Sequence, residues 1–223
     1  SRTEYILLSK LSELAKMKNL LSVWKEGLEG YRQIGMLSPS SSYLAREMIL
    51  DISEPNRKNL KILEVGPGTG PITRQIISQL KNDDTLDVVE LNENFLQTLK
   101  AKLMEEFSPE QLKNVQFHNS AVQDFLADRT EIYDNIVSAL PFFSLPQKLV
   151  EQIMQTYKNA LVSGGTLCWF EYVGLREGAV LLPGTTLEEI SRTYKKYFSR
   201  IQTLSKRIVW CNFPPARVIR VRK

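Results

Sequence analysis

A glycine-rich segment, GPGTG over residues 66–70, lies between a short apolar run and a helical pattern. The run Lys61–Val65 has the length and composition of a buried strand, and Pro71 suits the first turn of a helix, where its ring costs nothing. Glycines permit a left-handed backbone and let a bound group approach the main chain closely. A strand, a glycine loop and a helix in this order predict a ligand site at the carboxyl end of a parallel strand.

Strand-like and helix-like stretches alternate beyond this loop. Further strands are expected over 86–90, 115–118, 135–138 and 166–172, and helices over 41–50, 71–80, 93–107, 122–126 and 146–161. This alternation predicts a mostly parallel sheet covered on both faces, a doubly wound α/β fold. After a helix near 187–198, strand-like runs at 206–211 and 217–221 flank Asn212-Phe213-Pro214-Pro215. A connection this short favours an antiparallel pair, so a C-terminal hairpin should close the sheet.

Glu90 ends the second predicted strand. A carboxylate there can accept two hydrogen bonds from a ribose diol. The glycine spacing is G-x-G-x-G, and Pro71 stands where a dinucleotide fingerprint has another residue before its third glycine. The free N–H groups of the following helix suit the carboxylate of a ligand. Together these features favour a nucleoside without a pyrophosphate over NAD.

An amphipathic helical arm is expected at the N-terminus, over residues 1–36, before a domain at 37–223. Apolar residues recur there every three or four positions: Leu7, Leu11, Leu14, Met17, Leu21, Trp24 and Leu28. A serine-rich stretch over 38–42 separates this arm from the rest. The arm could lie in a membrane interface or pack as a lid, and both could hold in sequence.

Composition excludes several classes of protein. Hydrophobic residues make up 43% and charged residues 24%, as in an ordinary globular chain. Cys168, Cys211 and the single His118 allow neither a disulfide framework nor a recurrent metal-ligand spacing, so we expect no metal. No apolar run approaches the roughly 20 residues of a bilayer span, and no signal peptide opens the sequence, so we expect an intracellular protein.

Charge is distributed unevenly. Residues 192–223 contain ten basic side chains and no acid, whereas the remainder carries 19 basic and 25 acidic residues. Such polarity can steer a protein toward an anionic surface, either a membrane or a nucleic acid. The alternative is that these side chains form the solvated faces of a helix and two strands.

With these residues in place, the chain resembles the class I S-adenosylmethionine-dependent methyltransferases. Glu64, Gly66, Gly68 and Gly70 match the first motif of that superfamily, which also encloses Pro67, and Glu90 matches its ribose-binding acid. The resemblance covers the chain from about residue 34. It implies S-adenosyl-L-methionine as cofactor and a Rossmann-like, seven-stranded sheet with a reversed last strand. It also implies cofactor contacts from Leu91, Ser120, Ala121, Val122, Ser138 and Leu140, with Ser120 standing where the superfamily more often has an acid.

Three segments narrow the resemblance to bacterial phospholipid N-methyltransferases. These are QIG with PSS and LA over 33–45, SALPF over 138–142 (similar to S-G-L-P-L) and NFPPARV over 212–218 (similar to N-L-P-P-A-x-V). The family implies methylation of phosphatidylethanolamine towards phosphatidylcholine. It also implies a cytoplasmic enzyme peripheral on the inner face of the membrane, which touches anionic lipid through the N-terminal helix and the basic C-terminal region. Nothing in the sequence demands more than a monomer.

Methyl transfer is an in-line displacement that needs alignment and exclusion of water, and neither a metal nor a covalent nucleophile. Tyr31, Glu171 and Tyr172 are candidates to hold the substrate amine, because the last two end the fifth predicted strand on the site side. Tyr172 could instead be a core aromatic. No general base is assigned, since a desolvated pocket lowers the pKa of an ammonium group without one.

Other substrates remain open. Ribosomal RNA adenine dimethyltransferases carry N-x-P-Y/F after the same strand, similar to Leu140-Pro141-Phe142, and the basic C-terminus could bind phosphates. Against RNA, Ser138 replaces the asparagine whose carbonyl would accept from an adenine amine, and no C-terminal helical domain is predicted. A soluble amine is a further possible substrate. A non-catalytic adaptor that binds the cofactor as a structural ligand is also conceivable.

Overall fold

The computed structural model describes residues 41–54, 59–173, 187–197, 203–212 and 215–223. The strands are β1 (Lys61–Val65), β2 (Thr85–Glu90), β3 (Val115–Asn119), β4 (Tyr133–Ser138), β5 (Leu161–Tyr172), β6 (Thr203–Val209) and β7 (Ala216–Arg222). The helices are α2 (Ser42–Met48), α3 (Pro71–Ile77), α4 (Glu93–Glu106), α5 (Pro109–Leu112), α6 (Val122–Phe125), α7 (Gln147–Ala160) and α8 (Leu187–Tyr197), with a 3₁₀ turn η1 (Phe142–Ser144). The predicted N-terminal arm lies outside these residues.

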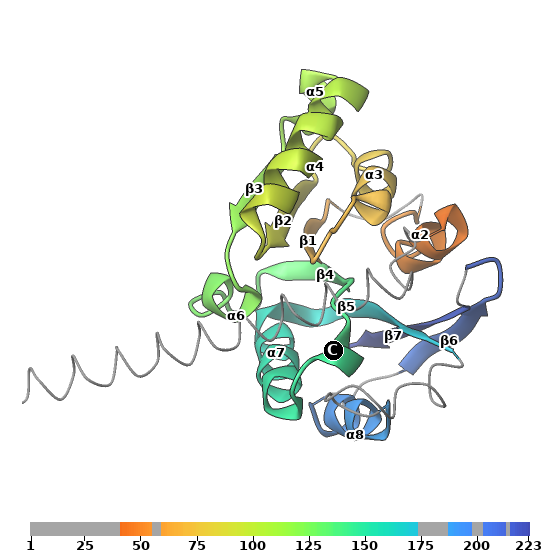
Figure 1. Cartoon of the computed structure of the whole chain (residues 1–223). Coiled ribbons are helices and arrows are strands. Elements are labelled where there is room, and N and C mark those ends of the chain that lie inside the picture. The colour runs from red at the N-terminus through yellow and green to blue at the C-terminus, as the bar shows by residue number, and fades with distance from the viewer. Residues whose placement is uncertain (1–40, 55–58, 174–186, 198–202, 213–214) are drawn as a thin grey trace, which may run out of the picture. The chain divides into compact units, whose positions relative to one another are not determined.

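Within this part of the chain, seven strands form one sheet in the order β3-β2-β1-β4-β5-β7-β6 (Figure 1). The strands β1 to β5 pair in parallel, and β7 runs antiparallel to both of its neighbours. The order reverses between β1 and β4, where open α/β sheets bind their ligands at the carboxyl edge. The doubly wound sheet with a reversed last strand, expected from the alternating pattern and the short connection before residue 217, is confirmed.

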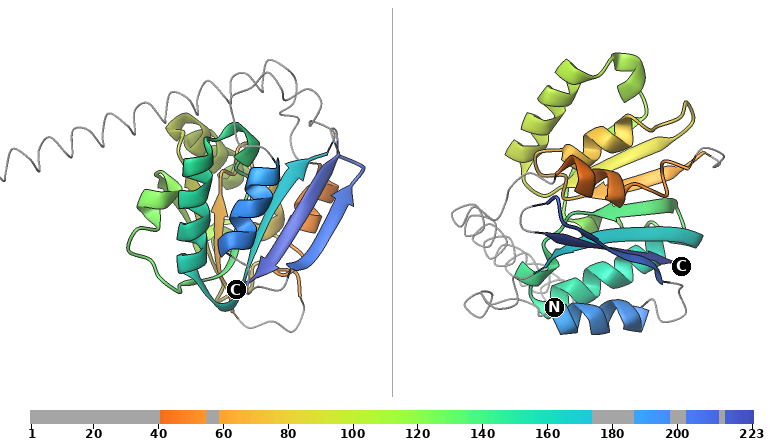
Figure 2. Two further views of the ribbon diagram at one scale, coloured as in Figure 1. Left: turned by 90° about the horizontal axis from the view of Figure 1, so that it is seen from below. Right: turned by 90° about the vertical axis from the view of Figure 1, so that its right-hand side faces the viewer.

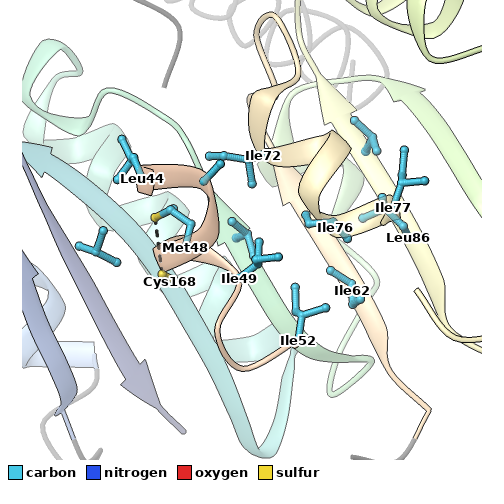
Figure 3. Close-up of a cluster of buried hydrophobic side chains, with 14 of the residues drawn as sticks. Leu44, Met48, Ile49, Ile52, Ile62, Ile72, Ile76, Ile77, Leu86 and Cys168 are labelled. Carbon is cyan, nitrogen blue, oxygen red and sulfur yellow. Dashed lines mark hydrogen bonds between the residues drawn. The ribbon is translucent and has the colours of Figure 1, made fainter. Parts of the chain in front are cut away.

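Helices cover both faces of the sheet (Figures 1 and 2). Packed on one face, α2, α3 and α4 form a continuous apolar core with the sheet, and Figure 3 shows the part of it at α2 and α3. In that core Met48 of α2 meets Cys168 of β5, with 3.6 Å between the two sulfur atoms. The other face carries α6, α7 and α8, and α7 buries a stripe at helical spacing: Leu149, Val150, Ile153, Met154, Tyr157 and Ala160. The helix predicted over 146–161 therefore buries one face against the sheet.

The boundaries differ from expectation mainly at short irregular elements. β5 begins at Leu161, five residues before the predicted start, because a bulge opposite β4 absorbs the irregularity and Gly164 takes a positive φ of 81° there. Neither α5 nor η1 was expected. A capping box between Ser108 and Gln111 opens α5. No helix among the described residues has the length and apolar character needed to cross a membrane.

Candidate functional site

The glycine loop lies at the carboxyl edge of the sheet, where β1, β2 and β4 end side by side. The N–H of Gly66 donates to the carbonyl of Val89 at 2.9 Å, and the N–H of Ala139 donates to the carbonyl of Val65 at 2.9 Å. These two bonds extend the parallel pairing of β1 with its neighbours into the loop. The loop is therefore held by the ends of both adjacent strands.

The three glycines of this loop have different surroundings, although each has positive φ: 70° at Gly66, 55° at Gly68 and 85° at Gly70. A Cβ atom at Gly66 would lie 2.9 Å from Cδ2 of Leu140, and one at Gly70 would lie 2.2 Å from Cδ1 of Leu99. At Gly68 no atom would lie within 4 Å. Protein packing thus requires glycine at 66 and 70, whereas Gly68 leaves open space that a ligand can occupy.

Glu64 lies beneath the loop and is completely buried. Burial raises the pKa of Glu64 to about 8, while the nearby Thr73 opposes the rise and the charge of Glu90 adds to it. Neither carboxyl oxygen has a hydrogen-bond partner of normal geometry among the described residues. Unused buried acceptors of this kind suit a ligand that brings hydrogen-bond donors, as the ammonium group of S-adenosylmethionine would.

Glu90 ends β2 beside the same loop. Its Oε1 accepts from the N–H of Asn92 at 2.9 Å. Burial raises the pKa of Glu90, while the main-chain amides of Asn92, Gly68 and Leu91 lower it. Because the Gly68 amide reaches this carboxylate, the glycine loop and the strand-ending acid that the sequence pointed to lie next to each other.

Asn119 is a site residue that the sequence did not identify. Its side-chain amide donates at 3.0 Å to the carbonyls of both Glu90 and Leu91, which ties the ends of β2 and β3 together. The following Ser120 donates its N–H to the Glu90 carbonyl at 3.2 Å and its hydroxyl to the Ala121 carbonyl at 3.0 Å. Leu91 and the residues from Ser120 to Val122 thus lie around the end of β2, and the adenine contacts expected of them stay a prediction.

Ser138 and Leu140, the two predicted cofactor contacts at the end of β4 and in the loop after it, have different surroundings. The Ser138 side chain is buried, and its Oγ accepts from the Tyr157 hydroxyl of α7 at 3.0 Å. By contrast, Leu140 packs under Gly66. Leu140 therefore belongs to the wall of the glycine loop, whereas the Ser138 hydroxyl is engaged by the helix behind the sheet.

The structure does not bring the three residues predicted to bind the substrate amine together. Tyr31 lies outside the described residues, and Glu171 and Tyr172 point to opposite faces because successive side chains of a strand alternate. Burial raises the pKa of Glu171, which the Trp169 side chain and the charges of Arg217 and Lys206 lower. Glu171 thus already has cationic neighbours within the protein.

Tyr172 instead joins an aromatic cluster on the face covered by α2 and α3. Its ring lies 6.3 Å from that of Phe143 and 5.3 Å from that of Phe170, both in edge-on arrangements. Phe143 directly follows the SALPF segment after β4, and that adjacency was the available sequence signal. Tyr172 is buried, whereas Phe143 and Phe170 are half-buried, and the rings of this cluster provide faces that attract a cation.

Comparisons with known proteins agree with this geometry. Residues 62–165 match the family described as "Methyltransferase domain". Ornithine lipid N-methyltransferase from Singulisphaera acidiphila is 30% identical over 145 residues, which span 60% of this chain and 67% of that protein. The relationship therefore rests on a family match and on a relative aligned over about two thirds of its length.

Solved structures share the fold. Magnesium protoporphyrin IX methyltransferase from Synechocystis PCC 6803, solved with bound SAH, has a TM-score of 0.61 at 12% identity and covers 82% of each chain. The N-methyltransferase NodS from Bradyrhizobium japonicum WM9, in complex with S-adenosyl-L-homocysteine, has a TM-score of 0.60 at 14% identity and covers 81% of this chain and 87% of its own. The glycine loop, the strand-ending acid and these relationships together show that the chain belongs to the class I methyltransferases and uses S-adenosyl-L-methionine as its cofactor.

Proposed function

We propose that this enzyme methylates the amino head group of a phospholipid, converting phosphatidylethanolamine towards phosphatidylcholine at the membrane surface. The observation that carries the proposal is a convergence at one edge of the sheet. The three segments that resemble phospholipid N-methyltransferases are far apart in sequence, and each has its described part near the end of β4 or β5 at the carboxyl edge of the sheet. The 30% identical relative, an ornithine lipid N-methyltransferase, adds independent support for a lipid amine as substrate.

Two contacts define this convergence. The N–H of Ser41, which caps α2, donates to Oδ1 of the buried Asn212 at 2.9 Å. Ala216, at the start of β7, pairs with Tyr172 at the end of β5. The described parts of the segments at 33–45 and 212–218 therefore meet next to the aromatic cluster, and Phe143, which directly follows SALPF, belongs to that cluster.

Specific roles follow for the chain's own residues. When bound, S-adenosylmethionine supplies a methyl group on a positively charged sulfur. In this proposal Glu90 accepts hydrogen bonds from the ribose hydroxyls, and the main chain around Gly68 lets the cofactor approach closely. Leu91 and residues 120–122 contact the adenine. The rings of Phe143, Phe170 and Tyr172 would attract the substrate ammonium and favour its methylated forms. Their apolar surroundings would lower the pKa of the amine and so free the lone pair for in-line attack.

Ornithine lipid is a second candidate substrate, favoured by the relative's activity. Ribosomal RNA is a weaker one, because the oxygen of the Ser138 side chain already accepts from Tyr157 and so competes with a flipped adenine amine. We further propose that residues 37–223 form the catalytic domain of an enzyme peripheral on the inner face of the membrane. In this proposal the arm over 1–36 and the basic C-terminal region bind anionic lipid.

The test is incubation with methyl-labelled S-adenosylmethionine and four acceptors in parallel: phosphatidylethanolamine vesicles, ornithine lipid vesicles, ribosomal RNA and soluble ethanolamine. Label in the organic extract of the phosphatidylethanolamine sample is expected. Label confined to ornithine lipid would assign that lipid as the substrate in place of phosphatidylethanolamine. Label only in RNA or ethanolamine would overturn the lipid assignment. The Glu90→Ala variant controls for cofactor-dependent transfer, and exposed Glu105→Ala controls for the substitution itself.

A further inference from the structure

Exposed aromatic side chains gather beside the convergence just described. Among the described residues, the large hydrophobic side chains left exposed are those of Tyr43 (60%), Leu50 (41%), Met104 (61%) and Trp210 (70%). Tyr43 lies in the first turn of α2, and Trp210 lies in the turn that follows β6. Tryptophan and tyrosine combine an apolar ring with a polar group, which suits the boundary between lipid and water.

The Ser41–Asn212 hydrogen bond holds these two aromatics near each other. Tyr43 is two residues from Ser41, and Trp210 is two residues from Asn212. Figure 1 shows the turn between β6 and β7 next to α2. We call Tyr43, Trp210 and the bond between their segments the aromatic edge.

A buried ion-pair network fixes α2 against the hairpin behind the aromatic edge. Arg220 of β7 is 4% exposed and lies 2.6 Å from Asp51 through its Nε. It also donates to the main-chain carbonyl of Glu47 and to the Ser205 hydroxyl. Because Arg220 holds α2 to the hairpin, Tyr43 and Trp210 can insert into a partner surface without the entropic cost of ordering a flexible loop.

The charge around the aromatic edge is positive. Arg46 of α2 is exposed, and Arg207 of β6 has a 68% exposed side chain. The nearby acids are Glu47 and Asp51, and both are paired with Arg220. Glu47 also lies 3.6 Å from Arg207, so the three arginines outnumber the two acids and the surface attracts anionic phosphates.

Resting on the function proposed above, we propose that the aromatic edge inserts into the head-group region of an anionic phospholipid bilayer. Tyr43 and Trp210 enter the interface, and Arg46 and Arg207 bind lipid phosphates. Because the aromatic edge adjoins Ala216 and Tyr172, this orientation brings the carboxyl edge of the sheet against the lipid surface. A lipid amine then reaches the cluster of Tyr172 and Phe143 without the lipid leaving the bilayer.

Cys211, next to Trp210, provides a direct probe. It is exposed, whereas the other cysteine of the sequence, Cys168, is buried and has a pKa raised to about 12 by burial. An environment-sensitive fluorophore on Cys211 of the full chain should shift its emission to the blue on vesicles of phosphatidylcholine and phosphatidylglycerol. Nitroxide-labelled lipids should quench it. A control label on a C211S/M104C variant should stay in water, since Met104 is comparably exposed on α4.

Paired variants test the contribution of the aromatic rings to binding. The Y43S/W210S variant should lower the vesicle partition coefficient at least about tenfold, because binding scales with the apolar surface inserted. M104S should bind as the parent protein does. Affinity for S-adenosylmethionine and the melting temperature, measured without lipid, should be close to parental in both variants, which separates a binding defect from misfolding.

Three results would overturn the proposal: unchanged partitioning of Y43S/W210S, a Cys211 label that stays in water on bound protein, or no vesicle binding by the parent chain. A parental dimer that becomes monomeric in Y43S/W210S would assign the aromatic edge to self-association instead. These vesicles contain no primary amine, so each result concerns the membrane contact alone. Methylation of phosphatidylethanolamine in detergent micelles tests the proposed substrate separately.

Discussion

At the scale of single residues, Glu90 should determine cofactor affinity. It is buried at the end of β2, and the Gly68 amide approaches its carboxylate. Replacing it with alanine leaves ribose hydroxyls unpaired, which costs about 1–3 kcal/mol, or roughly fivefold to over a hundredfold in affinity. Titration calorimetry with S-adenosylmethionine measures the loss, with Glu105→Ala on the exposed side of α4 as control. Parental affinity in Glu90→Ala would remove Glu90 from the cofactor site.

Glu64 should make stability depend on pH. Its pKa is about 8 in the folded protein against an ordinary value of 4.5, so between these values the folded chain holds a proton that the unfolded chain has lost. The free energy of unfolding should therefore fall as pH rises from about 4.5 to 8, by at most about 1.4 kcal/mol per pH unit. Glu64→Gln removes this titration and should flatten the profile.

Urea unfolding of the cofactor-free protein at several pH values measures the profile. Glu105→Gln, an exposed substitution of the same chemistry, should retain the parental slope. If Glu64→Gln and the parent lose stability in parallel above pH 6, the carboxyl of Glu64 ionises normally in the folded chain. The unused acceptors beneath the loop would then need another explanation.

At the scale of elements, the glycine loop combines a packing role with a binding role. At Gly70 the Cβ of alanine would clash with Leu99, and the left-handed backbone there is strained for alanine. Gly70→Ala should therefore lower the free energy of unfolding by about 2–4 kcal/mol. Alanine at Gly68 meets no atom within 4 Å and should cost only the backbone strain, about 1–2 kcal/mol, yet weaken cofactor binding more strongly. Thermal unfolding and calorimetry on both variants separate the effects, and equal effects on both quantities would contradict this division.

The attachment of α2 to the hairpin depends on one buried cation. Arg220→Met leaves Asp51 without its ion-pair partner and Glu47 with only the exposed Arg207, and should cost about 3 kcal/mol or more, as for a broken buried pair. Arg207→Gln removes an exposed arginine 3.6 Å from the same Glu47 and should cost under about 1 kcal/mol. Urea unfolding compares the two. A small loss in Arg220→Met would show that the apolar contacts of Leu44, Ala45 and Met48 hold α2 by themselves.

At the scale of the whole molecule, the sequence predicted those features that depend on local pattern and chain order. The alternation of strands and helices predicted a parallel sheet, and the short connection at 212–215 predicted its antiparallel closure. The glycine loop and Glu90 were assigned to one crevice because parallel strands share a carboxyl edge, and the structure places them side by side. Their ligand contacts are still predictions that the substitutions above would test.

Features that depend on packing between distant segments were not predictable. Alternation along a strand puts Glu171 and Tyr172 on opposite faces, but position at a strand end did not show which of them lies on the face covered by α2 and α3. The Tyr157 hydroxyl on Ser138 depends likewise on the rotation of α7 about its axis. Arg220 was counted among the basic residues of a charged region, yet it is buried against α2, where it donates to the carbonyl of Glu47, 173 residues away in sequence, and pairs with Asp51.

The uneven charge of the whole chain leads to the last prediction. Ten basic residues and no acid lie within 192–223, while the remaining residues carry an acidic excess. Each basic residue close to an anionic leaflet contributes about 1 kcal/mol, and salt screens this attraction because the Debye length falls from about 10 Å at 0.1 M to about 3 Å at 1 M. Flotation with phosphatidylglycerol vesicles should therefore lose most bound protein across that range, while S-adenosylmethionine affinity changes little. If binding survives high salt, or equals that on pure phosphatidylcholine, the basic region is a solvated surface and apolar insertion alone holds the enzyme to lipid.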